Sequence, residues 1–214
     1  MDPSPAARHT VVKVCGITRL EDARAALEAG ADWLGFVLWE GSPRRVDPDR
    51  AAEIVAASRA TVAVAVMVRP TPEQAAALAA RIGAARVQLH EVDPLTWPPD
   101  FPLATTFAIP VSPAGTLERP LPRSGPLVML DASDYLKVGG TGQRIPWESA
   151  RVVAATRDVL LAGGLDADCV RDALDQVRPF GVDASSGLER EPGIKDADKV
   201  RRFVAAVRAY DAAL

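Results

Sequence analysis

The chain has 214 residues, 48% of them hydrophobic, which suits one large domain or two small ones with a sizeable buried core. Its formal net charge of -3 at pH 7 gives no basic field for attracting nucleic acid or anionic lipid. We therefore expect neither nucleic acid nor a membrane as a partner, and no apolar run is long enough to cross a bilayer.

Residues 1–10, MDPSPAARHT, lack the charged and then apolar pattern of a secretory signal. We interpret them as a flexible leader, followed by one catalytic domain over residues 11–214. The two cysteines, Cys15 and Cys169, lie far apart and form no Cys-x-x-Cys or Cys/His grouping. The sequence therefore predicts neither a disulfide framework nor a metal site, and a reducing cytoplasm is the expected location.

Apolar runs alternate with helical patterns along the chain, which is typical of parallel strands joined by crossover helices. Eight such units in about 200 residues match the lower size limit of the (β/α)8 barrel. A doubly wound sheet is the alternative, but the usual G-x-G-x-x-G loop does not follow the first strand. We therefore predict an α/β protein, a single TIM barrel. Its strands are expected at 11–15, 33–38, 61–68, 86–90, 102–107, 126–131, 158–163 and 180–185.

Capping chemistry marks several helix starts between these strands. The candidates are two capping boxes, Thr18 with Glu21 and Thr71 with Gln74, and two N-cap aspartates, Asp47 and Asp166.

One unit departs from the alternation. Residues 111–126 contain four prolines, and proline in a helix interior removes a hydrogen bond and clashes with the preceding turn. We expect a loop in place of the fifth helix.

Polar residues end four of the predicted strands, and in barrels the active site lies at the carboxyl ends of the strands. Cys15 ends the first strand, although a free cysteine there is more often a small core residue. Asp131 needs hydrogen-bond partners or a function, with a helix cap as its alternative role. Asp183 orients a loop or holds Lys13 in the simplest interpretation, and we interpret His90 as a hydrogen-bonded core histidine.

Two glycine-rich turns follow the seventh and eighth predicted strands, where phosphate sites of such barrels are commonly built. Gly163 and Gly164 lie in the first turn, and Ser186 and Gly187 in the second. Small residues there let backbone N–H groups approach a phosphate dianion. Alternatively, these small residues only mark the turns between strands and helices and bind nothing.

Eight short motifs occur in order at sensible spacing: VKVCGIT, EAGADWLGFV, GSPRRV, VQLH, VMLDAS, GGTG, LAGGL and VDASSGLE. Through them the chain resembles the phosphoribosylanthranilate isomerase family of tryptophan biosynthesis. The resemblance implies an Amadori rearrangement of a small phosphosugar substrate, N-(5-phosphoribosyl)anthranilate. Because only protons move in such a reaction, neither a cofactor nor a metal is expected.

The resemblance also assigns roles to residues of this chain. Cys15 matches the general base, Asp131 the general acid, Arg44 the partner of the anthranilate carboxylate, and Asp183 a supporting carboxylate near the substrate amine. To donate a proton near neutrality, Asp131 needs a pKa above the usual value of about 3.9, and the thiol needs one below about 8.5. Lys13 is a candidate for lowering the pKa of the thiol.

Four residues depart from the family pattern. Arg69 replaces a usual asparagine, Glu91 replaces a usual glycine, and Ile145–Pro146 replaces Phe-Asp before Trp147. Two alternatives stay open: a related isomerase with a histidine-pathway or dual substrate, and a non-catalytic phosphosugar-binding barrel. We expect a monomer, with a homodimer as the alternative.

Overall fold

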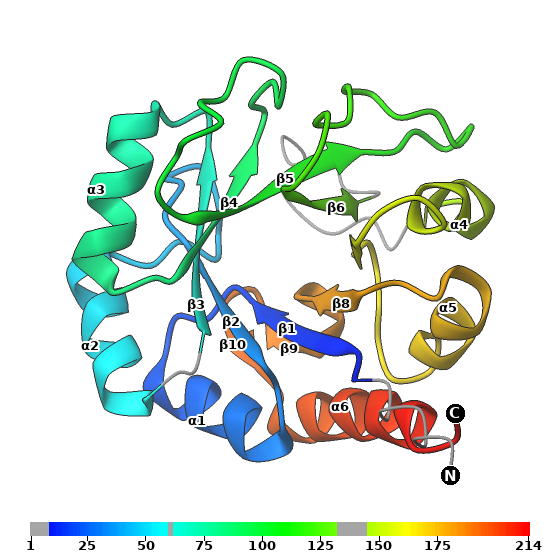
Figure 1. The fold of residues 1–214 in the computed structure, drawn as a ribbon. Coiled ribbons are helices and arrows are strands. Elements are labelled where there is room, and N and C mark those ends of the chain that lie inside the picture. The colour runs from blue at the N-terminus through cyan, green and yellow to red at the C-terminus, as the bar shows by residue number, and fades with distance from the viewer. Residues whose placement is uncertain (1–8, 60–61, 132–144) are drawn as a thin grey trace, which may run out of the picture.

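Eight parallel strands close into a barrel in the computed structural model, which describes residues 9–59, 62–131 and 145–214. Each strand pairs with the next along the chain, and the last pairs with the first (Figure 1). The strands are β1 (Val11–Cys15), β2 (Trp33–Val37), β3 (Val62–Val68), β4 (Arg86–His90), β5 (Ala104–Pro110), β6 (Leu127–Asp131), β7 (Val159–Leu161) and β8 (Gly181–Ala184). The predicted TIM barrel is confirmed. Only β5 is displaced, because it begins after Pro102, which has no backbone donor.

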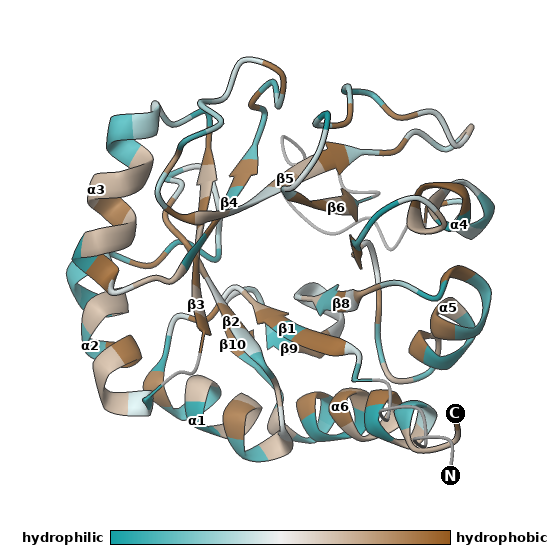
Figure 2. Cartoon of the chain, viewed as in Figure 1, coloured by the Kyte–Doolittle hydropathy of each residue, from teal (hydrophilic) through white to brown (hydrophobic). Residues whose placement is uncertain are grey.

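Six helices of the described ranges lie outside the barrel: α1 (Leu20–Ala29), α2 (Pro48–Ser58), α3 (Pro72–Ile82), α4 (Trp147–Ala154), α5 (Val170–Val177) and α6 (Ala197–Asp211). Their apolar faces pack on the outward side chains of the strands, and their polar faces point away (Figure 2). A second apolar cluster fills the barrel interior, from Trp33 near one end to Ala162 near the other. In the ranges the structure describes, no helix combines the length and apolarity needed to cross a membrane.

Two of the predicted caps are confirmed. The hydroxyl of Thr71 accepts from the backbone N–H of Gln74, and the side chain of Gln74 accepts from the backbone N–H of Thr71 at 2.9 Å. Asp47 accepts from the backbone N–H of Asp49, also at 2.9 Å. Proline stands at the first helical position in both helices, where its missing donor is harmless.

The other two predicted caps are wrong. Helix α1 has Arg19 as its N-cap, because the hydroxyl of Thr18 donates instead to the carbonyl of Gly193. Asp166 accepts from the backbone of Asp168 and Cys169, so it stabilises the turn before α5 and not the helix itself.

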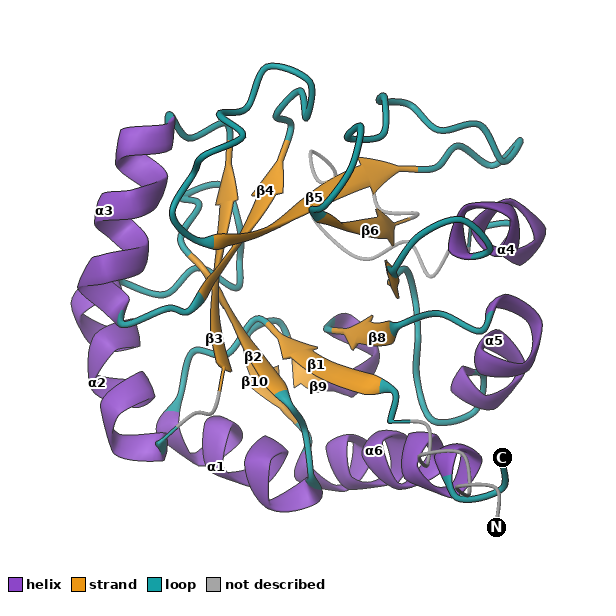
Figure 3. Cartoon of the chain, viewed as in Figure 1, coloured by secondary structure: helices purple, strands orange, loops and turns teal. Residues whose placement is uncertain are grey.

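The barrel lacks a helix on the side of β4 and β5, where loops cover the strands (Figure 3). The loop predicted for residues 111–126 is confirmed. The expectation of a crossover helix after β4 is wrong, since residues 91–103 also contain four prolines and form no helix. The side chain of Trp97 packs where part of that helix would have packed. Its ring lies 5.1 Å from the ring of Phe101 and 6.3 Å from the ring of Phe107, both in edge-on geometry.

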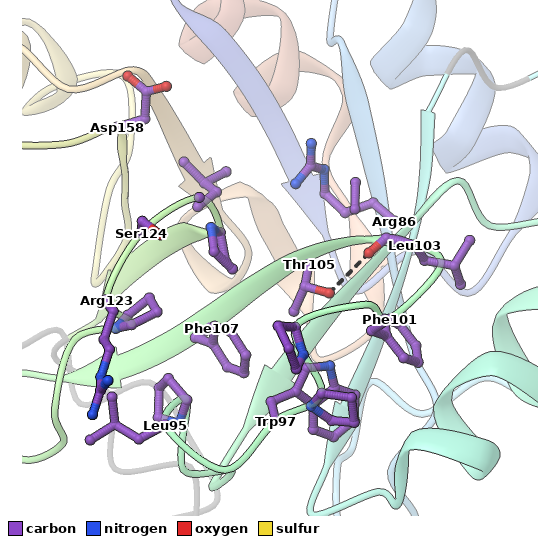
Figure 4. Close-up of a pocket in the computed structure, with 18 of the residues that line it drawn as sticks. Arg86, Leu95, Trp97, Phe101, Leu103, Thr105, Phe107, Arg123, Ser124 and Asp158 are labelled. Carbon is purple, nitrogen blue, oxygen red and sulfur yellow. Dashed lines mark hydrogen bonds between the residues drawn. The ribbon is translucent and has the colours of Figure 1, made fainter.

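Beside this aromatic group lies a cavity of about 960 Å³ (Figure 4). Its lining includes Arg86, Ala104 and Leu127, the first residues of three strands. The cavity therefore opens at the amino ends of the strands, the end opposite to the one where the polar residues predicted for the site are found.

The chain is anchored from residue 9 onward. The side chain of His9 lies 2.8 Å from the carboxylate of Asp32, and the hydroxyl of Thr10, which is buried, donates to Asp211. These two residues of the predicted leader thus contact the barrel, while residues 1–8 lie outside the described ranges.

Candidate active site

Cys15 and Asp131 both end strands with their side chains directed into the barrel. Cys15 belongs to the interior apolar cluster. Asp131 alternates in phase with Leu127 and Met129 of the same cluster, so its side chain points to the same face of β6. The two residues are 6% and 5% exposed. The structure thus places the predicted base and acid at the rim where the carboxyl ends of the strands meet.

Asp183 holds Lys13, as the simplest interpretation of the sequence expected. The two residues are direct neighbours in the register of β1 and β8, and the Nζ atom of Lys13 lies 2.7 Å from a carboxylate oxygen of Asp183. Lys13 is fully buried. Burial lowers its pKa, but the interactions with Asp183 and Cys15 together outweigh burial and leave the pKa of Lys13 above its ordinary value. Lys13 is therefore a cation enclosed in the barrel.

Gly35 on β2 lets Cys15 and Lys13 approach each other. A Cβ atom at Gly35 would lie 2.8 Å from the sulfur of Cys15 and 3.0 Å from the Nζ atom of Lys13. Any larger residue would occupy the space into which both groups project.

The pKa of the Cys15 thiol differs from the expectation. Burial is the largest influence and raises it above the ordinary value of 9.0, whereas the charge of Lys13 lowers it. The net shift is upward, because the barrel interior disfavours the thiolate more than one cation favours it. The thiol is thus mainly protonated at neutral pH, and Lys13 is the nearest cation that supports its charged form.

His90 is a buried, hydrogen-bonded core histidine, as predicted. It is 2% exposed, and its Nε2 atom lies 2.8 Å from the side-chain nitrogen of Gln88. Burial, with a smaller contribution from Lys13, lowers the pKa of His90 to about 3. The imidazole therefore stays neutral near neutral pH, and it is unsuited to proton transfer there.

The two glycine-rich turns lie side by side. Gly163 and Gly164 both adopt left-handed backbone conformations after β7, with φ of 93° and 62°. After β8, Ser186 begins a short 3-10 helix, η1 (Ser186–Leu188). A Cβ atom at Gly187 would collide with the carbonyl of Leu165 in the preceding turn. Both turns therefore meet only because position 187 has no side chain.

Arg44 extends from the loop after β2 across Gly16, the residue that follows Cys15. A Cβ atom on Gly16 would lie 2.9 Å from the Cδ atom of Arg44. Its guanidinium binds the buried carboxylate of Glu189, with the Nη2 atom 2.9 Å from Oε2. Sequence reasoning missed Glu189. The signal that was available is the Pro-Gly dipeptide at 192–193, which marks the turn of a small hairpin.

The departures at Arg69 and Glu91 share an unusual backbone. Both residues have positive φ, 49° and 55°, and their side chains form an ion pair of 3.4 Å. Glycine and asparagine, the residues usual in the family, are the types that adopt this conformation most readily. Among the other departures, Ile145 is buried and Pro146 is the N-cap of α4.

The described residues include no group of three or more His, Cys, Asp or Glu side chains arranged to hold a metal ion. The GGTG motif and the two residues after Asp131 fall at 139–142 and 132–133, outside the described ranges.

Comparison with known proteins gives consistent results over nearly the whole chain. Residues 12–206 match the family model of N-(5'phosphoribosyl)anthranilate (PRA) isomerase. The N-(5'-phosphoribosyl)anthranilate isomerase of Rubrobacter xylanophilus is 41% identical over 207 residues, which are 92% of this chain and 98% of that protein.

Two solved structures are similar over the whole barrel. Monomers of the dimeric phosphoribosylanthranilate isomerase of Thermotoga maritima align with a TM-score of 0.79 and 32% identity, over 94% of this chain and 100% of that one. A phosphoribosyl anthranilate isomerase in complex with reduced 1-(o-carboxyphenylamino)-1-deoxyribulose 5-phosphate aligns with a TM-score of 0.76 and 31% identity, over the same shares.

Proposed function

The chain belongs to the N-(5'-phosphoribosyl)anthranilate isomerase family, and on this premise we propose that Cys15 and Asp131 are the general base and general acid of its reaction. That reaction is the Amadori rearrangement of N-(5-phosphoribosyl)anthranilate to 1-(2-carboxyphenylamino)-1-deoxyribulose 5-phosphate in tryptophan biosynthesis. The observation that carries the assignment is the shared position of the two side chains, which both end strands and point into the barrel mouth.

The chemistry requires two proton transfers. Asp131 delivers a proton to the furanose ring oxygen while the lone pair of the anthranilate nitrogen opens the ring. Cys15, as thiolate, then removes the proton from C2 of the resulting imine, which yields the enolamine and finally the ketose. General acid-base catalysis of this kind is typically worth about 10²- to 10⁴-fold in rate.

The remaining residues bind the substrate in this proposal. The adjoining turns at Gly163–Gly164 and Ser186–Gly187 receive the phosphate, since small residues let backbone N–H groups approach a dianion. Arg44 binds the anthranilate carboxylate, for which its planar pairs of donors are suited. Asp183, held 2.7 Å from Lys13, has a supporting role near the substrate amine.

The test follows the loss of phosphoribosylanthranilate fluorescence during turnover. Cys15→Ala and Asp131→Ala should each lower kcat by at least about a hundredfold. Cys169→Ala is the matched control, because Cys169 is the second buried thiol and lies at the start of α5, where it contacts backbone carbonyls. Full activity in either site variant would remove that residue from the mechanism.

Turnover assays with each of the two substrates separate the two alternatives. A wild-type protein that fails to turn over the substrate while staying folded would favour a non-catalytic phosphosugar-binding barrel. Turnover of the histidine-pathway aminoaldose would favour the related isomerase or a dual substrate.

We further propose a cytoplasmic monomer. Both cysteines are free, as in a reducing compartment. The large hydrophobic side chains exposed among the described residues are few: Leu95, Val152, Phe180 and Leu214. Sedimentation should give one species near 22.7 kDa. A species of twice that mass would instead match the dimeric state of the Thermotoga maritima enzyme.

A further inference from the structure

A small antiparallel hairpin follows η1 and covers the loops after β1 and β2. It consists of β9 (Glu189–Glu191) and β10 (Ile194–Lys195). Its turn residue Gly193 has a φ of 80°, and a Cβ atom there would lie 3.3 Å from the carbonyl oxygen of Pro43. The backbone N–H of Lys195 donates to Asp22 at 3.1 Å. The hairpin is therefore fastened directly beside Arg44.

The guanidinium of Arg44 is fixed by the hairpin. Its Nε atom lies 3.0 and 3.1 Å from the two carboxylate oxygens of Glu189, and its Nη2 atom lies 2.9 Å from one of them. The Arg44 side chain is 16% exposed and the Glu189 side chain 5%. This contact uses the edge of the guanidinium between Nε and Nη2. The other pair of parallel donors, on Nη1 and Nη2, is the one suited to a second carboxylate.

Glu189 is itself held by two further donors. The Nζ atom of Lys195 lies 2.8 Å from its Oε1 atom, and the backbone N–H of Gly193 donates to the same oxygen at 3.2 Å. Lys195 also donates to the carbonyl of Ser185, whose hydroxyl donates to the carbonyl of Cys15. The hydrogen bonds thus run from Arg44 to the end of β1.

Basic side chains outnumber acidic ones in this group, because Arg44 and Lys195 surround one carboxylate at a place where nearly all members are buried. Burial lowers the pKa of Lys195, and the charge of Glu189 opposes this shift. A buried excess of basic groups favours an anionic group of a ligand.

We propose that Glu189 is a positioning residue for the substrate carboxylate, because it fixes the guanidinium of Arg44 in the orientation that receives it. Lys195 balances the charge of Glu189, so that Arg44 keeps its own charge for the ligand. The proposal rests on the role of Arg44 in the proposed function. A donor that is already immobile loses less conformational freedom when the ligand binds.

The test compares Glu189→Gln with Glu191→Gln. The two residues belong to the same strand, but Glu191 is exposed. Glu189→Gln should raise the KM for phosphoribosylanthranilate about tenfold with little change in kcat, since it loosens a binding group and leaves the proton-transfer groups in place. Glu191→Gln should leave both constants unchanged. The inhibition constant of inorganic phosphate, which probes the separate phosphate turns, should be equal in all these proteins.

A double-mutant cycle with Arg44→Lys separates positioning from a general structural effect. If Glu189 acts through Arg44, Glu189→Gln adds no further increase in KM when lysine already stands at position 44. Equal increases in both backgrounds, or a Glu189→Gln protein that behaves like Glu191→Gln, would overturn the proposal.

Two further variants complete the design. If Glu189→Gln fails to fold, KM is measured for two other variants. Glu189→Asp keeps the carboxylate, and Lys195→Gln removes the basic partner of Glu189. Glu189→Asp should bind better than Lys195→Gln, and the reverse order would contradict the proposal. An unchanged KM in Arg44→Lys alone would instead remove Arg44 from substrate binding. That result would contradict the proposed function itself, and it needs no variant of Glu189.

Discussion

Lys13 and Asp183 form an ion pair of 2.7 Å inside the barrel, between the first strand and the last. Their side chains are 0% and 6% exposed. Cys15 lies two residues after Lys13 on the same face of β1, and a Cβ atom on Gly35 would touch both groups. The cation that closes β1 onto β8 is therefore also the one beside the proposed base.

The first prediction concerns the pH dependence of the reaction. Burial raises the pKa of Cys15 above 9.0 and Lys13 opposes this rise. A general base acts only when deprotonated, so kcat/KM should increase with pH from neutrality up to the pKa of the thiol. Lys13→Met removes the opposing charge and should move the rising limb of the profile to higher pH, together with a loss of activity at pH 7.

A direct probe of the thiol checks this prediction. In a Cys169→Ala background, the rate of alkylation by iodoacetamide reports the thiolate fraction of Cys15 alone. Lys13→Met should lower this rate at every pH below the pKa. Because the variant leaves Asp183 buried without its partner, circular dichroism must first confirm folding. A folded variant with unchanged rates would exclude the role of Lys13.

The second prediction concerns the left-handed backbone at position 91. With φ at 55°, a residue that has a Cβ atom is strained there by about 1 kcal/mol or more, whereas glycine is not. Glu91→Gly should therefore be more stable than Glu91→Ala by about 1 kcal/mol in urea denaturation. Both variants lose the ion pair with Arg69, so the comparison isolates the backbone. At Arg151, within α4, the order should be reversed, with alanine more stable.

The third prediction compares two threonines that the sequence presents alike. Thr71→Ala removes a complete capping box and should lower the free energy of unfolding by about 1 kcal/mol without affecting kinetics. Thr18→Ala removes the hydrogen bond to Gly193 in the hairpin and should raise KM. Urea denaturation and steady-state kinetics on both variants check this. Identical behaviour of the two would show that the hairpin contact has no bearing on binding.

The fourth prediction concerns stability at low pH. Burial raises the pKa of Asp32, but hydrogen bonds from the Val12 backbone, Arg208 and His9 outweigh it, so its pKa is below 3.8. A carboxylate whose pKa is lower in the folded state stabilises the fold above its unfolded pKa, and this contribution is lost as pH falls through the folded value. Asp32→Asn should cost about 1 to 2 kcal/mol at pH 7 and progressively less below pH 3.8.

Thermal denaturation at a series of pH values measures this effect. Asp175→Asn is the control, since its exposed ion pair of 4.0 Å with Arg171 should contribute less than about 1 kcal/mol. A loss in Asp32→Asn that does not depend on pH would mean that shape, and not charge, matters at this position.

The barrel was predictable from the sequence because its signals are local. Alternating apolar runs marked all eight strands, and Thr71 and Asp47 marked two helix starts through residues two or three positions away. Thr18 and Asp166 carried the same local signal but form other contacts, since Gly193 competes for the hydroxyl of Thr18 across 175 residues. The sequence pattern of one segment does not show which group of a distant segment will take its hydrogen bonds.

The positions of the candidate site residues at strand ends were predictable, but their partners were not. Strand ends indicated Cys15 and Asp131, and their inward direction agrees with strand alternation. The partnership of Arg44 with Glu189 was not predictable from spacing, because 145 residues separate them and the barrel must close before they meet. The rise in the pKa of Cys15 was also missed, since it depends on the extent of burial, which the sequence states only indirectly.

The pairing of β1 with β8 has a consequence for synthesis on the ribosome. Residues 11–15 leave the exit tunnel long before residues 181–184, yet they hydrogen-bond to one another in the finished protein. The ion pair between Lys13 and Asp183, next to Cys15, therefore cannot form until most of the chain has been translated. The proposed site can therefore form only when about the last seventh of the chain is being made, so prematurely terminated chains are expected to be inactive.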